Sequence, residues 1–270
     1  MTSPSPSEPL TPRLYHAAFA PVTAVKLAAV SIGTIWGIQT VLYLFGTLDL
    51  VSATLSDLVV IAMLLVFARR RGGLAALGLR RSSPRFVLAG ILIGSSVWYI
   101  ALRLVDWLRP PGDTQVLQNI VEQSALVPTL AAIAIMPAIA EELVFRGVLA
   151  RGLATRLPAM LAIVLSTLLF CAFHLLPAQM VGVLPLALAL GVLALRADSV
   201  IPTIIAHFIN NVIGVLIARD GLPASVLGTI NAYPNLLLLA AFGVAGVGLA
   251  IATRRTVSKP ESPEPASPRP

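Results

Sequence analysis

Residues 127–149 read VPTLAAIAIMPAIAEELVFRGVL, an apolar run interrupted by two adjacent glutamates and an arginine. As a helix rising 1.5 Å per residue, the run covers the roughly 30 Å of a bilayer's hydrocarbon core. The rest of the chain is similar, with 57% hydrophobic and 11% charged residues and a mean hydropathy of +0.89. Soluble domains carry roughly 25% charged residues. The composition therefore excludes a soluble globular enzyme and predicts an integral membrane protein.

Seven further runs of comparable apolarity flank this one, and they predict an all-α fold, a polytopic membrane bundle of about eight transmembrane helices. The very short connections near Pro177 and Asp198 predict adjacent antiparallel helices. The eight expected spans are Val22–Phe45, Leu50–Ala68, Phe86–Leu108, Val127–Leu149, Ala159–Leu176, Ala178–Leu195, Val200–Ala218 and Leu236–Thr253.

Basic residues between the runs predict the orientation. Six arginines lie in the connection at residues 69–85, and the positive-inside rule places this connection, and with it both termini, in the cytoplasm. The opposite side then receives only Arg109 and Arg219 from the loops. We therefore interpret the net charge of +7 as a topology signal and expect no nucleic-acid partner.

Ionisable side chains inside the expected spans are candidates for function, because each costs at least a few kcal/mol at bilayer depth. Asp57 is a lone acid in the second span, for which we expect a structural role. Arg103 and Asp106 are three residues apart, which predicts an interfacial salt bridge on one helical face.

The glutamate pair in the opening stretch is more unusual. Glu142 and Arg146 are four residues apart, so they can form an ion pair on one helical face. Glu141 points about 100° away and lacks that partner, an arrangement suited to general-base chemistry. Pro137 precedes Glu141 by four residues and removes a helical hydrogen bond, so we expect a kink with room for water beside the acid.

Two histidine motifs lie on separate apolar runs. Phe170 and His174 are one helical turn apart, and so are His207 and Asn211. A single membrane histidine is more often an interhelical hydrogen-bonding group than a catalyst. Polar groups from three helices in one dry bundle, together with Glu141, instead predict a functional site.

Two kinds of chemistry fit these groups. In the first, Glu141 takes a proton from a water molecule held by a histidine, and Asn211 with a histidine stabilises the developing oxyanion. In the second, Glu141, His174 and His207 bind a divalent metal such as zinc, although the sequence contains no HExxH motif. His174 is expected nearer the opposite face than the other two, so convergence requires a later helix start or tilted or broken helices.

Three motifs taken in order resemble those of a known family, the CAAX protease and bacteriocin-processing (CPBP) membrane proteases. This family includes the type II CAAX prenyl endopeptidases and the lysostaphin-resistance-protein-A-like proteins. The motifs are Glu141-Glu142-x-x-x-Arg146, Phe170-x-x-x-His174 and His207-x-x-x-Asn211.

The resemblance implies an eight-helix intramembrane endopeptidase that acts on a membrane-embedded or membrane-anchored protein or peptide, in the cytoplasmic membrane. Glu141 is implied to activate water, with Glu142, Arg146 and Phe170 in support, and His174, His207 and Asn211 to hold the water and the oxyanion. Glutamate-dependent hydrolysis is favoured over metal dependence. The implied segments are a polar tail (1–21), transmembrane helices with a basic cytoplasmic loop (22–126), a CPBP-like protease core (127–218), the last transmembrane helix (219–253) and a disordered Pro-rich tail (254–270).

Two other functions use the same Glu and His residues. One is an ion-coupled or proton-coupled transporter in which they form an ion pathway. The other is a non-catalytic membrane scaffold in which they only hold helices together.

Overall fold

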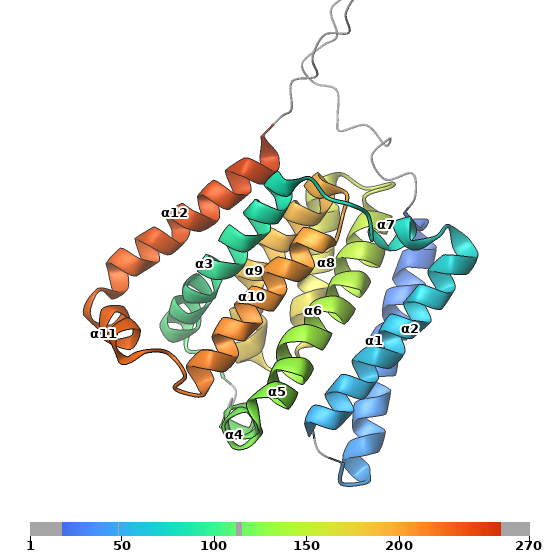
Figure 1. Cartoon of the computed structure of the whole chain (residues 1–270). Coiled ribbons are helices and arrows are strands. Elements are labelled where there is room, and N and C mark those ends of the chain that lie inside the picture. The colour runs from blue at the N-terminus through green and yellow to red at the C-terminus, as the bar shows by residue number, and fades with distance from the viewer. Residues whose placement is uncertain (1–17, 48, 112–114, 255–270) are drawn as a thin grey trace, which may run out of the picture.

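The computed structural model describes residues 18–47, 49–111 and 115–254, and within them the regular secondary structure is entirely helical (Figure 1). Nearly all of the two predicted polar tails lies outside the described residues. Seven helices are long and apolar enough to cross a membrane. The protein is therefore a multi-pass integral membrane protein with the predicted helix-bundle architecture.

Six of the seven spanning helices are single α-helices: α1 (Pro21–Leu44), α2 (Asp49–Arg71), α3 (Pro84–Leu108), α9 (Pro177–Ala197), α10 (Ile201–Ala218) and α12 (Pro234–Thr253). The seventh, Leu126–Leu153, is continuous but changes its helical type along its length. Its segments are α5 (Leu126–Thr129), the π-helical η3 (Leu130–Ile135), α6 (Met136–Glu141), the π-helical η4 (Glu142–Ala150) and α7 (Arg151–Leu153).

The predicted span Ala159–Leu176 differs most from expectation. It forms α8 (Ala159–Phe173), a helix of only 15 residues, which is shorter than the roughly 20 residues that cross a bilayer. The chain turns at Leu175, which has a positive φ of 61°, before Pro177 starts α9. Two short helices were not predicted, α4 (Gln115–Gln123) and α11 (Ala224–Ala232).

The bundle has two chemically different ends. We call the end that carries the α2–α3 connection, α7 and the described chain ends 18 and 254 the basic end. The other end, where α1 turns into α2 and where α4 and α11 lie, is the far end (Figure 1). α10 crosses the bundle beside α3 and α6, so its side chains reach the centre.

Two glycines let α10 lie unusually close to α3. A Cβ added at Gly90 would lie 2.4 Å from the carbonyl oxygen of Pro202, and one added at Gly94 would lie 2.3 Å from that of Ala206. Any larger residue would push the two helices apart. Ala206 precedes His207, so this close packing helps to fix the depth of His207 in the bundle.

Arg151 joins three segments at the basic end and is fully buried. Its guanidinium donates to the carbonyl oxygens of Ala75 and Ala76, in the short 3₁₀-helix η2 (Leu74–Leu77), and to Asp198 between α9 and α10. Arg80 also pairs with Asp198. Arg151 is therefore a buried structural charge whose partners lie far away in the sequence.

We expect Asp198→Ala to lower the free energy of unfolding by about 3 kcal/mol or more, because it leaves the buried Arg151 guanidinium without its counter-charge. Thermal unfolding of the purified chain in detergent measures this change. Asp106→Ala is the control, since its pair with Arg103 is largely exposed and should contribute less than about 1 kcal/mol. Equal effects of the two substitutions would contradict a structural role for Asp198.

Candidate functional site

Both glutamates of the pair approach the same imidazole, that of His207 on α10. Glu142 Oε1 lies 2.9 Å from His207 Nδ1, and Glu141 Oε2 lies 3.8 Å from His207 Nε2. All three residues are more than nine-tenths buried. A carboxylate oxygen only accepts, so Nδ1 carries the proton that is donated to Glu142, and Nε2 faces Glu141.

Arg146 neutralises Glu142 as predicted. Its Nη1 donates to Glu142 Oε1 at 2.8 Å, and neither side chain is exposed by more than 1%. Nη2 donates to the carbonyl oxygen of Ala187 on α9, and the guanidinium lies 4.3 Å from the ring centroid of Phe170 on α8. One arginine therefore connects three helices around the site while it holds Glu142 charged.

His174 lies at the end of α8, and its ring turns back toward the site. Its Nδ1 donates to the carbonyl oxygen of Phe170 at 2.9 Å, and the two rings are 4.9 Å apart. Phe170 also contacts His207, with the ring centroids 6.1 Å apart. Phe170 therefore contacts both histidines, although α8 begins at Ala159 as expected.

Asn211 donates to a backbone carbonyl of the long helix that Pro137 leaves without its usual α-helical donor. Pro137 has no N–H to donate to the carbonyl four residues earlier, which is Ile133. That carbonyl instead accepts from Asn211 Nδ2 at 2.9 Å. The sequence predicted a kink at Pro137, and the structure places π-helical segments on either side of α6, an arrangement frequent at functional sites.

The residues do not form a metal-ligand set. Among the described residues, no three His, Cys, Asp or Glu side chains are grouped as metal ligands. His207 Nδ1 is engaged by Glu142, and His174 Nδ1 by the Phe170 carbonyl.

The remaining membrane acids have different surroundings. Asp106 forms the predicted salt bridge with Arg103 at 3.0 Å, near the far end of α3. Asp57, for which we expected a structural partner, is 5% exposed and lies within electrostatic range of Glu141. This proximity could not be predicted from the sequence, because α2 and α6 are brought together only by tertiary packing.

Comparison with known proteins bears on this same region. The family model of the type II CAAX prenyl endopeptidases, described as Rce1-like, matches residues 123–213. The matched third of the chain contains every residue of the site described above except Asp57. Searches of the curated proteins and of the solved structures found no match. The resemblance given by the three motifs is confirmed over the matched residues.

The two adjacent glutamates should respond differently to neutralisation. We expect Glu142→Gln to lower the free energy of unfolding by about 3–5 kcal/mol, because Arg146 becomes an unpaired buried charge. Glu141→Gln, the matched control, should change it by less than about 1 kcal/mol, since no hydrogen bond to Glu141 is found among the described residues. Thermal unfolding in detergent compares the two, and an equal loss for both would contradict the assigned pairing.

Proposed function

We propose that this CAAX protease-like chain is an intramembrane endopeptidase in which Glu141 activates a water molecule for attack on a peptide bond. The observation that carries the proposal is the placement of His207 between the two glutamates. Glu142 fixes the orientation of the ring, and Glu141 faces its other nitrogen. The family match over residues 123–213 supports the peptidase class.

The geometry suits a water shared by Glu141 and His207. A water that donates one hydrogen to Glu141 Oε2 and the other to His207 Nε2 fits two acceptors 3.8 Å apart. Glu141 takes the first proton as the water oxygen attacks the carbonyl carbon. Burial makes this proton transfer more effective, because few solvent molecules compete for the carboxylate.

The later steps use the same groups. The carbonyl oxygen becomes an oxyanion, for which we propose the Asn211 amide as the donor. His174 gives its Nδ1 proton to the Phe170 carbonyl, so its Nε2 is left as an acceptor that can hold the water. The proton held by Glu141 then passes to the leaving nitrogen, and the peptide bond breaks to give a carboxyl and an amine. Asn211 retains one amide hydrogen for this role, since the other is donated to Ile133.

The substrate proposed is a membrane-embedded or membrane-anchored protein or peptide, in the cytoplasmic membrane. The site lies on helices that span the bundle, so a peptide bond must approach it within the bilayer or at its surface. A lipid anchor or a transmembrane segment would bring the bond to that depth. No feature of the described residues selects a prenyl group over another anchor.

Glu141→Gln should reduce peptide hydrolysis by about 10²–10⁴-fold, the usual contribution of a general base. The reconstituted chain would be offered a library of lipid-anchored fluorogenic peptides. Glu122→Gln on α4, whose carboxylate is exposed and accepts only from Gln118, is the control and should retain full activity.

Equal cleavage by the wild type and Glu141→Gln would refute the mechanism. Ion flux through the reconstituted chain that survives inhibition of cleavage would favour the transporter. A biological phenotype left intact by both Glu141→Gln and His207→Ala would favour the scaffold.

Removal of divalent metal should leave the hydrolysis rate within about twofold of its initial value. The reason is that the two His207 nitrogens face the carboxylates of Glu141 and Glu142 and do not point, together with other side chains, at one metal position. The measurement is the cleavage rate after treatment with 1,10-phenanthroline, with metal analysis of the same sample. A loss of activity that added zinc restores would establish metal dependence instead.

A further inference from the structure

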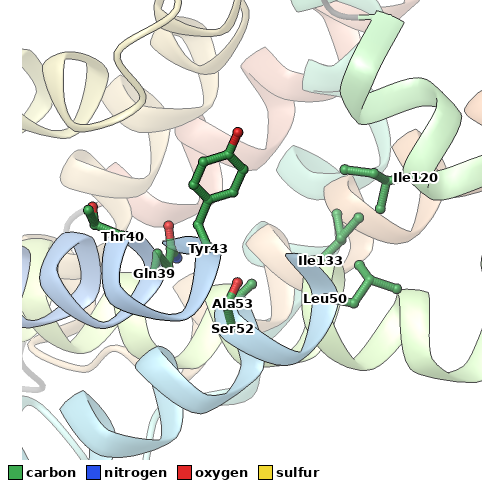
Figure 2. A pocket seen from close by; sticks show the side chains of 8 residues that line it. All are labelled: Gln39, Thr40, Tyr43, Leu50, Ser52, Ala53, Ile120 and Ile133. Carbon is green, nitrogen blue, oxygen red and sulfur yellow. The ribbon is translucent and has the colours of Figure 1, made fainter. Parts of the chain in front are cut away.

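A cavity of about 410 Å³ lies between α1, α2, α4 and η3, toward the far end of the bundle. Figure 2 shows the side chains that line it. Half of them are polar, and these belong to α1 and α2: Gln39, Thr40, Tyr43 and Ser52. These four side chains can hydrogen-bond water at that depth, while apolar atoms form most of the remaining lining surface.

Two of the lining residues connect the cavity to residues near the glutamates. On α2, Ala53 lines the cavity and Asp57 follows four residues later. On the long helix, Ile133 lines it, and the Ile133 carbonyl holds Asn211, which is one turn beyond His207. The cavity therefore approaches the two glutamates from the far end.

Hydrogen-bonding groups continue from the cavity toward Asp57. Gln39 Nε2 donates to Ser56 Oγ at 3.2 Å, and Ser56 Oγ donates to the carbonyl oxygen of Ala53 at 2.8 Å. Ser56 is fully buried and immediately precedes Asp57. These groups lie where α1 packs against α2, next to Asp57 in the sequence.

Asp57 is a buried acid whose carboxylate lacks a protein donor. It is 5% exposed, and the hydrogen bonds and ion pairs found in the described part of the chain include none to its carboxylate. The carboxyl groups of Asp57 and Glu141 are close enough to interact electrostatically. Two buried acids with no protein donor need water or a shared proton between them.

Toward the basic end, the described residues that follow Asp57 are packed by apolar side chains and a buried arginine. Beyond Asp57, α2 buries Val60, Leu64 and Ala68 completely, and η2 places Leu77, also fully buried, against η4. The Arg151 guanidinium fills the space between η2 and Asp198. Apolar packing and a saturated ion pair therefore close this end.

From these observations we propose that the cavity is the water inlet of the site and that Asp57 holds the incoming water beside Glu141. The inference rests on the proposed hydrolytic function for the role of Asp57, whereas the inlet itself does not depend on catalysis. Water that enters at the far end passes Gln39 and Ser56, meets the Asp57 carboxylate and reaches Glu141 and His207.

The inlet is tested by cysteine accessibility, for which this chain is convenient because Cys171 is its only cysteine. In a Cys171→Ala chain reconstituted in liposomes, single cysteines are exposed to the charged thiol reagent MTSET. Ala53→Cys should react at least tenfold faster than Val59→Cys on the lipid-facing side of α2 or the buried Val60→Cys. Thr40→Cys is the second cavity variant, used if Ala53→Cys does not fold.

Reaction of the cavity cysteines no faster than that of Val59→Cys would overturn the inlet. The reagent is added to one face of oriented liposomes at a time, and the inlet predicts faster reaction from the far end. Faster reaction from the basic end would overturn it as well. These outcomes do not depend on whether the chain cleaves a peptide.

Asp57 is tested by Asp57→Asn, which keeps the shape and removes the charge. We expect kcat on the lipid-anchored peptide library to fall at least tenfold with KM within twofold, no loss of thermal stability, and partial recovery in Asp57→Glu. A purely structural Asp57 predicts the opposite, a lower Tm with kcat preserved.

Full activity of Asp57→Asn beside an inactive Glu141→Gln would overturn the role of Asp57 alone. An active Glu141→Gln variant would instead overturn the proposed hydrolytic function. The cysteine-accessibility experiment would then still test whether the cavity admits water. The two failures are therefore distinguishable.

Discussion

The ion pair between Glu142 and Arg146 is the interaction on which the site depends. A charge at bilayer depth persists only with a partner, and each of these two groups is the counter-charge of the other. Glu142 also orients His207, while Arg146 reaches the backbone of α9 and the ring of Phe170. One buried pair therefore sets the position of four helices and the tautomer of the proposed catalytic histidine.

The backbone of the long helix provides a second constraint. Pro137 removes a hydrogen-bond donor inside a membrane helix, where an unsatisfied carbonyl would cost several kcal/mol. Asn211 satisfies the freed Ile133 carbonyl from another helix. The proline thus creates an interhelical contact as well as a local distortion. That contact holds the turn of α10 that carries Asn211 beside the site. The close approach of α10 to α3 at Gly90 and Gly94 fixes the same helix from the other side.

Local spacing and apolar runs were sufficient to predict the membrane class, seven of the spans and the Glu142–Arg146 pair, because each depends on residues near one another in the sequence. The short α8 was not predicted, since apolar residues continue on both sides of its end, with only His174 between Phe173 and Leu175. The burial of Arg151 was missed because its partners are about 50 to 75 residues away. The hydrogen bond of Asn211 to Ile133 and the electrostatic interaction of Asp57 with Glu141 depend on tertiary packing in the same way.

Two adjacent residues of identical chemistry acquire different roles from their surroundings. Glu142 accepts from an arginine and a histidine, so its negative charge is stabilised and it supports the structure. Glu141 lacks such donors and shares its environment with a second unpaired acid, Asp57. A folded protein retains unpaired buried carboxyls only where the stability they cost is balanced by a use. This difference in partners is why we propose Glu141, and not Glu142, as the reactive glutamate, and why we propose a role for Asp57 among the acids outside the family motifs.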